Sequence, residues 1–187
     1  MEGESVEFRL VYHGRLPAAS QSDGRASDKH RIRKIFHPQL KELWNTHPAL
    51  RMDVANLENR HANNYVEYGY RFVPLVSSHF NVCCSLDILF LRRDQPGNLI
   101  RNGGDIDNRI KVLFDALRKP NNSNELAGAM PANDEDPFFC LLEDDRLITQ
   151  VNVTTDRLLT PAVPDEGQND IHLIIHVATI ALRTPTL

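Results

Sequence analysis

The stretch from Ile106 to Leu117 constrains the fold more than any other part of this 187-residue chain. Its apolar residues recur at helical spacing and mark one face of an amphipathic helix: Ile106, Ile110, Leu113, Phe114 and Leu117. Asp105 follows two glycines, where a helix N-cap is expected. Asp107 and Lys111 lie four residues apart on another flank. The stretch therefore predicts a helix with one face in the core and acidic residues at its outer start.

A second acidic cluster, Glu143-Asp144-Asp145, lies between an apolar run at 138–142 and a β-favouring run at 147–154. A turn before a strand needs one such acid, not three. Two explanations for the acids at the helix start stay open. Helix capping and an i,i+4 pair between Asp107 and Lys111 would only stabilise the helix. Carboxylates brought together from both clusters would instead bind a cation.

These residues together resemble the RusA-like endodeoxyribonucleases, a family of small Holliday-junction resolvases. The resemblance rests on Asp-Ile-Asp-Asn-x-x-Lys-x-x-x-Asp-Ala-Leu at 105–117 and Glu-Asp-Asp-Arg at 143–146, and it covers about residues 80–180. It implies that Asp105, Asp107 and Asp145 form a Mg²⁺ site and that Lys111 lies near the reacting phosphate. It also implies that the protein is a homodimer.

Two features depart from the family pattern. Leu147 stands where the family commonly has a glutamine. The family also tends to join the helix tightly to the next strand, whereas here Lys119–Pro137 intervenes. The Asn, Ser, Asp and Pro content of this segment and its lack of apolar periodicity predict a mobile, exposed acidic loop at 119–137.

Composition favours one soluble globular domain over residues 1–187, because 41% of the residues are apolar and 25% are charged. No run approaches the ~18 apolar residues of a transmembrane helix. The acidic start, Met1-Glu2-Gly3-Glu4, is unlike a signal peptide, so a cytoplasmic protein without membrane contact is expected. The spacing of Cys83, Cys84 and Cys140 fits neither a disulfide framework nor a zinc site, which predicts reduced core cysteines.

The net charge of −4 is unevenly spread. Residues 121–145 hold seven acids and no Lys or Arg, so the rest of the chain carries +3 where the whole carries −4. Five Lys or Arg fall between Lys29 and Lys41, on a face that is either simply solvated or in contact with phosphates. Further arginines surround the start of the helix predicted at 106–117. The candidate DNA contacts are Arg31, Arg33, Lys34, Arg92, Arg93, Arg101 and Arg109.

The order of elements predicts an α+β fold, with helices packed on a mixed or antiparallel sheet. Strands are expected at 6–12, 80–91, 147–158 and 171–181, and helices from Ser27 or Asp28 to Trp44 and over 106–117. Pro38 should kink or restart the first helix. The aromatic residues of 65–76 are expected to pack in the core more than to stack on bases. Asp87, alone in an apolar strand, is expected at a strand end or hydrogen-bonded in the core, with a fourth metal ligand as the alternative.

The resemblance implies Mg²⁺-dependent hydrolysis of phosphodiesters in branched DNA, such as a four-way junction, during DNA recombination and repair. Carboxylate ligands suit Mg²⁺ better than zinc. A symmetric dimer would act on two opposing strands. The main alternative is a non-catalytic RusA-like DNA-binding or structural protein. A weaker one is a metal-dependent hydrolase of small phosphates.

Overall fold

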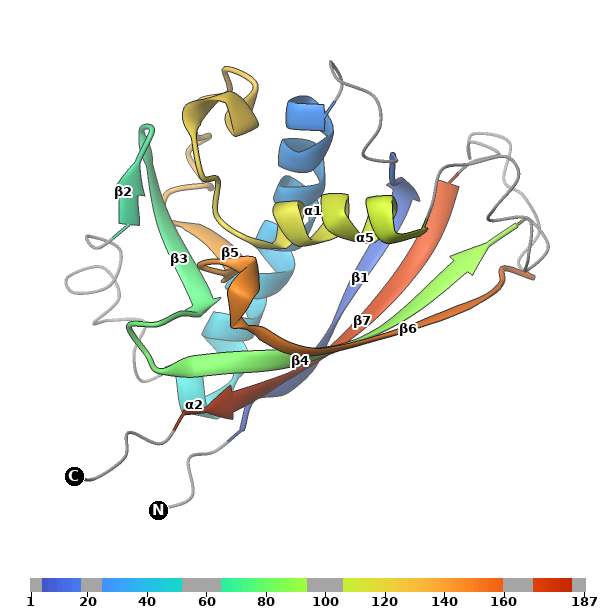
Figure 1. Ribbon diagram of the computed structural model, residues 1–187. Helices are drawn as coiled ribbons and strands as arrows, with labels where there is room; N and C mark the ends of the chain where they lie inside the picture. Colours follow the sequence, from blue (N-terminus) through green and yellow to red (C-terminus); the bar gives the residue numbers. More distant parts are fainter. Residues whose placement is uncertain (1–4, 18–24, 52–64, 94–105, 160–169, 183–187) are drawn as a thin grey trace.

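The structure, a computed structural model, describes residues 5–17, 25–51, 65–93, 106–159 and 170–182 (Figure 1). The fold class is α+β, as the sequence predicts. The elements are β1 (Glu7–Arg15), α1 (Arg25–Thr46), α2 (Pro48–Arg51), β2 (Val66–Glu67), β3 (Tyr70–Val76), β4 (Val82–Arg92), α5 (Ile106–Leu117), the 3₁₀ turn η3 (Ser123–Leu126), β5 (Phe138–Leu142), the 3₁₀ turn η4 (Asp145–Leu147), β6 (Ile148–Arg157) and β7 (Asp170–Ala181).

Four long strands form the main sheet in the order β1-β7-β4-β6. β7 pairs antiparallel with both β1 and β4, whereas β6 pairs parallel with β4. The buried residues of β7 alternate strictly, from Ile171 through Leu173, Ile175 and Val177 to Thr179. Such alternation produces a sheet with one face in the core and one face outward.

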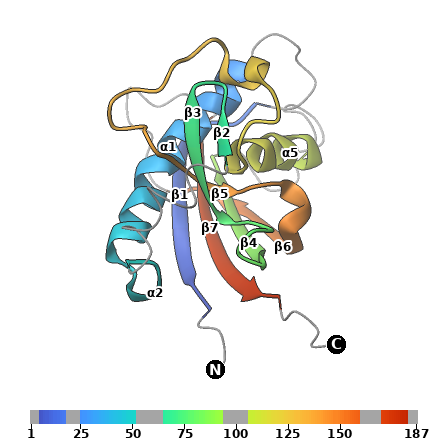
Figure 2. The same ribbon diagram turned by 90° about the vertical axis from the view of Figure 1, so that its left-hand side faces the viewer.

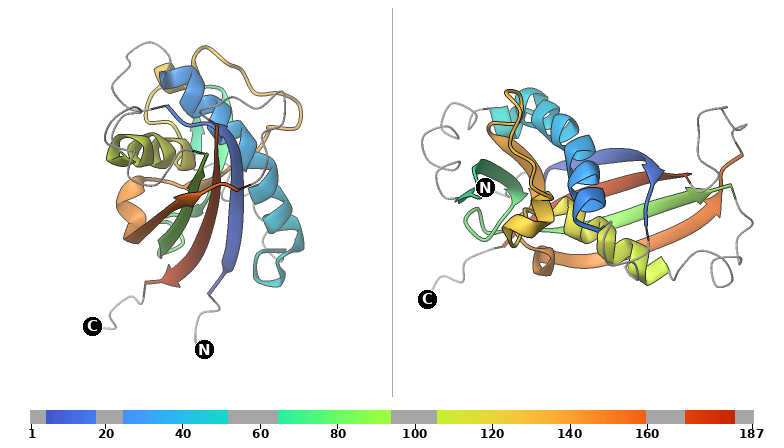
Figure 3. Two further views of the ribbon diagram at one scale, coloured as in Figure 1. Left: turned by 90° about the vertical axis from the view of Figure 1, so that its right-hand side faces the viewer. Right: turned by 90° about the horizontal axis from the view of Figure 1, so that it is seen from above.

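The helices α1 and α5 cover a single face of this sheet (Figures 1 and 3). On α1 the buried residues Ile32, Phe36, Leu40 and Trp44 recur every fourth position. Burying each side chain contributes roughly 1.5–3 kcal/mol, enough to hold the helix on the sheet. α1 runs without a break through Pro38, whose side chain is exposed. Proline removes one helix hydrogen bond, but Phe36 and Leu40 on either side of it are buried in the core, and their packing keeps the helix continuous.

A second sheet, in the order β2-β3-β5, was not expected from the sequence. β3 and β5 pair in parallel, both α1 and α5 contact β5, and Figure 2 views the molecule from the side on which this small sheet lies. β5 is only five residues long and entirely buried, so its sequence has no alternation to distinguish a strand from a helix segment. Tyr70 and Phe72 lie in a buried cluster with Phe138, which confirms packing as their role.

The cysteines of the two sheets are buried, whereas Asp87 of β4 is exposed. Cys83, Cys84 and Cys140 are buried and free, as expected. Asp87 is neither at a strand end nor in the core, contrary to the expectation. It is exposed in the middle of β4 and accepts a hydrogen bond from Asn152 Nδ2 at 3.2 Å. The sequence interpretation failed because it assumed that β4 is covered on both faces.

Candidate functional site

The start of α5 carries two of the predicted site residues on its exposed side. Asp107 lies in the first turn and Lys111 one turn later, and both side chains are exposed. Asp107 Oδ1 accepts a hydrogen bond from the Asn108 backbone N–H at 2.7 Å. Within the described parts of the chain, neither Asp107 nor Lys111 takes part in an ion pair. The i,i+4 pair that would give these residues a purely stabilising role is therefore not formed.

Asp145, the other predicted carboxylate that the structure describes, opens η4. The Asp144 side chain caps this turn by accepting from the Arg146 backbone N–H at 3.0 Å, and this leaves the Asp145 side chain exposed. Leu147 packs against the main core. η4 contacts α5, but Figures 1 and 3 show it beside the C-terminal half of that helix, at the start of β6.

The backbone pairing explains why η4 lies there. Arg118, directly after α5, pairs with Leu142, three residues before Asp145. Asp107 lies eleven residues before Arg118, which corresponds to about 16 Å along a helix axis. Asp107 thus lies at the start of α5, whereas η4, which contains Asp145, follows a strand that pairs with the residue after the C-terminal end of α5. Among the described residues no three His, Cys, Asp or Glu side chains form a group that could hold a metal. Asp105 and Arg101 lie outside the described residues.

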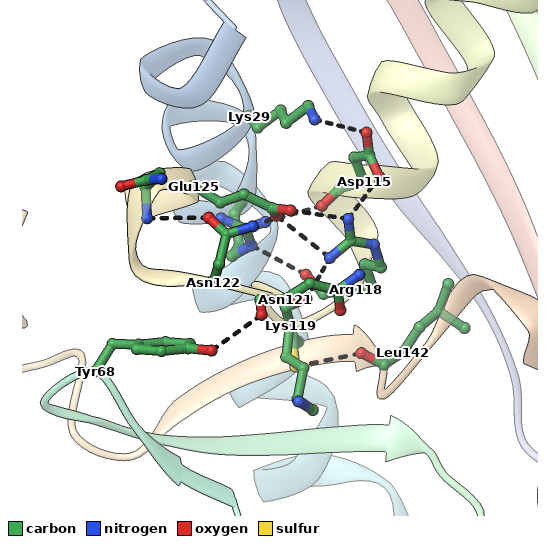
Figure 4. A network of polar contacts seen from close by, with 12 residues as sticks. Lys29, Tyr68, Asp115, Arg118, Lys119, Asn121, Asn122, Glu125 and Leu142 are labelled. Carbon is green, nitrogen blue, oxygen red and sulfur yellow. Dashed lines mark hydrogen bonds and ion pairs between the residues drawn. The ribbon is translucent and has the colours of Figure 1, made fainter. Parts of the chain in front are cut away.

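The C-terminal end of α5 is a buried ionic network (Figure 4). Asp115 pairs with Lys29 of α1 at 2.7 Å and with Arg118 at 2.7 Å. Arg118 also pairs with Glu125 of η3 at 3.0 Å. Arg33 of α1 donates to the backbone carbonyls of Arg118 and Asp115 at 3.0 and 2.8 Å. The network ties together α1, α5 and η3.

Burial and charge act in opposite directions on the pKa values of this network. Burial alone would raise the pKa of Asp115, but the hydrogen bond from Lys29 and the positive charge of Arg118 lower it overall. Burial lowers the pKa of Arg33 to about 10 against the opposing charge of Glu125, so its guanidinium is still protonated at neutral pH. All these charges are therefore retained and partnered inside the protein.

Two of the predicted DNA contacts on α1, Arg33 and Lys34, form ion pairs within the protein. The sequence places Arg33 on an exposed face, but its side chain is only 1% exposed. This part of the interpretation is wrong, because residues 118–125 pack over that face of α1. Lys34 pairs with the buried Glu135 at 2.9 Å. Arg31 is more exposed, and donates to the Arg15 carbonyl at 2.7 Å.

The segment 119–137 is more closely anchored than a surface loop. Leu126 and Glu135 are 2% and 7% exposed, while Met130 is 71% exposed. Lys119 pairs with Glu67 at 2.9 Å, and Arg71 pairs with Asp136 at 2.7 Å. The sequence missed this arrangement because the partners are polar and distant along the chain. The mobility of the segment stays a prediction.

The predicted arginines near α5 differ in exposure. Arg109 is 9% exposed and donates to the Leu16 carbonyl. Arg92 and Arg93, at the end of β4, are half-buried. Arg157 of β6 is the register partner of Arg92 and is exposed. Figures 1 and 3 show that these strand ends and the start of α5 lie toward the same end of the molecule. Arg157 was missed because only the parallel pairing of β4 and β6 brings it beside Arg92.

A cavity of about 220 Å³ lies elsewhere, between the end of α1, α2 and the main sheet. Its lining is apolar apart from Thr179 and includes Trp44, Leu75 and Phe80. Among the described residues, no carboxylate, histidine or basic side chain lines it.

Comparisons of the sequence with protein-family models and with curated proteins, and of the fold with solved structures, found no match. In the described part of the chain, none of the helices is both long enough and apolar enough to span a membrane.

Proposed function

We propose that this protein is a Mg²⁺-dependent endodeoxyribonuclease that resembles the RusA-like resolvases and hydrolyses phosphodiesters in branched DNA. The observation that carries the proposal is the exposed start of α5. Asp107 and Lys111 stand one turn apart there, and no described residue neutralises either charge by an ion pair. An acid and a base that contribute no ion pair to the fold are available for a cation and a phosphate.

The charged residues near the start of α5 have separate roles in the proposed hydrolysis. Asp107 has a carboxylate oxygen that is not used in its bond to Asn108, and a hard oxygen ligand suits Mg²⁺. When bound, Mg²⁺ supplies Lewis-acid polarisation of the phosphodiester. Lys111 stabilises negative charge on the phosphate in the transition state. Arg92 and Arg157 contact flanking phosphates and so position the strand. Two copies of the chain would present two such sites to a junction.

The second candidate is a non-catalytic relative that binds branched DNA without cutting it. The position of η4 favours it, because Asp145 lies near the C-terminal half of α5 while Asp107 lies at its start. A nuclease of the proposed kind holds its cation with carboxylates from both elements. In the non-catalytic candidate, Arg92 and Arg157 still bind phosphates. Asp107 and Asp145 are too far apart to hold a cation together.

Incubation of the purified protein with a labelled four-way junction separates these candidates. The nuclease predicts cleavage in Mg²⁺, none in EDTA, and little cleavage of a linear duplex of the same sequence. The non-catalytic relative predicts a retarded complex in both buffers and no product. Absence of both cleavage and junction binding would refute both candidates.

A further inference from the structure

The cavity of about 220 Å³ lies where β1 and β4 begin and where β7 ends. Val82, the first residue of β4, lines it, whereas Arg92 is the last residue of that strand. The cavity is therefore at the opposite end of the main sheet from the site proposed at the start of α5. Figure 1 shows α2 beside these strand ends, and Ala49 and Leu50 of α2 also line the cavity.

The cavity opens to solvent on one side. Its wall includes the buried Trp44 and Leu75, which are 2% and 5% exposed, and the exposed Ala181 at the end of β7. Leu50 and Phe80, also in the wall, are half-buried. A small molecule can therefore enter past Ala181 without the unfolding of a described helix or strand.

Thr179 is the only described residue of the wall that carries a hydroxyl group. The inward-facing row of β7 is apolar until it reaches Thr179, which is 7% exposed. Thr179 Oγ1 accepts a hydrogen bond from the Val6 backbone N–H at 2.8 Å, and the hydroxyl hydrogen has no acceptor in the described chain. Because a hydroxyl donates as well as accepts, Thr179 can donate a hydrogen bond to a molecule in the cavity.

Trp44 supplies a second unusual group to the wall. Its Nε1–H is buried, and no residue that the structure describes accepts a hydrogen bond from it. A buried indole N–H usually has a partner, because an unsatisfied buried donor is costly. Phe80 adds another aromatic ring to the same wall. The wall thus combines aromatic surface with two donors, on Trp44 and Thr179, that lack a described acceptor.

Size and charge restrict the occupant of this cavity. Its volume exceeds the roughly 150 Å³ of an apolar cavity that binds benzene, and is below the roughly 300 Å³ at which pockets for drug-sized ligands begin. No charged side chain lines it among the described residues, so an ionised ligand would lose its hydration without gaining a partner. Water is a poor occupant as well, because each buried water needs several polar partners. A neutral, substituted ring fits these conditions.

We propose that this cavity is a binding site for a small neutral aromatic molecule that carries one hydrogen-bond acceptor, a carbonyl or ether oxygen. The ring packs against Trp44 and Phe80, and the oxygen accepts a hydrogen bond from the Thr179 hydroxyl. The hydrogen bond adds selectivity for the oxygen, whereas burial of the ring supplies most of the affinity. The site goes beyond the proposed nuclease and involves none of its residues.

Acetophenone and ethylbenzene are matched probes, because they differ mainly in a carbonyl group that a methylene replaces. Trp44 is the only tryptophan of the chain, so its indole N–H gives a single cross-peak in a proton–nitrogen correlation spectrum. Titration with acetophenone should move this cross-peak to a saturable end point, since the bound ring lies against Trp44. Ethylbenzene should bind roughly three- to tenfold more weakly, the ratio that corresponds to one hydrogen bond.

The part of Thr179 is tested by the ratio of the two affinities. Thr179→Val keeps the shape of the side chain and removes the hydroxyl, so acetophenone and ethylbenzene should bind equally well. Thr179→Ser keeps the hydroxyl and should retain the preference for acetophenone. A purely structural role of Thr179 would weaken both probes alike and leave their ratio unchanged.

The location of the site is tested on β7. Ala181→Phe fills the exposed side of the cavity and should abolish the shift of the Trp44 cross-peak. Ala178→Phe is the matched control, since its side chain points to the opposite face of the same strand, and acetophenone should still bind. Three results would each overturn the proposal: no saturable shift in the wild-type protein, unchanged binding in Ala181→Phe, or a preference for acetophenone that survives in Thr179→Val. None of them depends on whether the protein cuts DNA.

Discussion

The charged residues at the two ends of α5 differ in burial and in ion pairing. At the C-terminal end, Asp115 and Arg118 are largely buried and paired with residues of α1 and η3. At the start, Asp107 and Lys111 are exposed and form no ion pair with any described residue. Both ends belong to one helix and one sequence motif, Asp-x-x-x-Lys-x-x-x-Asp over 107–115. The motif alone does not distinguish the charges that stabilise the fold from those available for function.

The difference has a physical basis. A buried charge without a partner is costly, so the buried Asp115 and Arg118 need the partners that α1 and η3 supply. An exposed charge costs almost nothing and is also worth almost nothing to stability. Asp107 and Lys111, which form no ion pair with a described residue, therefore add little to the stability of the fold. The difference between charges that stabilise the fold and charges available to a ligand can be tested by mutation. The predictions run from the largest expected effect to the smallest.

The largest loss is expected at Arg33. Arg33→Ala removes the donors to the Arg118 and Asp115 carbonyls and leaves Glu125 with one partner fewer. Breaking such a buried network should lower the free energy of unfolding by about 3 kcal/mol or more. Arg31→Ala is the control, with a loss below about 1 kcal/mol, because that side chain is 43% exposed. Urea unfolding measures both. Equal losses would mean that the network does not anchor α1.

A smaller, pH-dependent loss is expected from His30. Burial lowers the pKa of His30 to about 4, and its Nδ1 has no hydrogen-bond partner in the described chain. The unfolded chain takes up this proton near pH 6.5, whereas the folded protein does not until about pH 4. Stability should therefore be complete above pH 6.5 and fall by roughly 3 kcal/mol as the pH drops to 4.

Thermal midpoints across this pH range check the His30 prediction. His30→Phe should flatten the decline, and what is left should include His37, whose pKa burial also lowers. A decline as steep in His30→Phe as in the wild type would show that other groups control acid stability.

An effect on DNA binding is expected at the ends of β4 and β6. Arg157→Ala should reduce the salt dependence of junction binding, because each lost phosphate contact lowers the slope of log K against log salt by about 0.9. Lys34→Ala should leave the slope nearly unchanged, since Lys34 already pairs with Glu135. Fluorescence anisotropy between 50 and 200 mM salt, roughly the range in which such slopes are resolved, gives the comparison. A larger change in Lys34→Ala would place the DNA on α1.

The smallest effect on stability is expected at Asp107. Asp107→Asn should change the free energy of unfolding by less than about 0.5 kcal/mol, because the residue is exposed and not ion-paired with a described residue. Asp115→Asn, on the same helix, should cost several times more, because it weakens the pairs with Lys29 and Arg118. Thermal unfolding of the two variants side by side measures the contrast directly.

Much of the fold follows from periodicity in the sequence. The α5 face of Ile110, Leu113 and Leu117 is buried as its spacing predicts, and the strands of the main sheet fall near their expected ranges. Periodicity reports which face is buried but not what covers it. It therefore missed the small sheet, where β5 is buried throughout, and it misjudged Asp87, whose face of the sheet is open.

The candidate site could be predicted only in part. Local sequence was sufficient to place Asp107 and Lys111 on the outer side of a helix. It was not sufficient to place Asp145 relative to them, because that position depends on the pairing of Arg118 with Leu142 across the segment 119–137. The same segment covers Arg33, so a residue that looks exposed on a helical wheel is buried. Contacts between residues distant in the chain decided both outcomes.

The most direct test of the proposed function is junction cleavage by Asp107→Asn, measured together with junction binding and thermal stability. The variant keeps the shape of the side chain and removes one charge. If Asp107 holds the catalytic cation, cleavage in Mg²⁺ should be abolished while the junction is bound at least as tightly and the protein is at least as stable. A wild-type cleavage rate in Asp107→Asn would contradict the assignment of the start of α5 as the metal site.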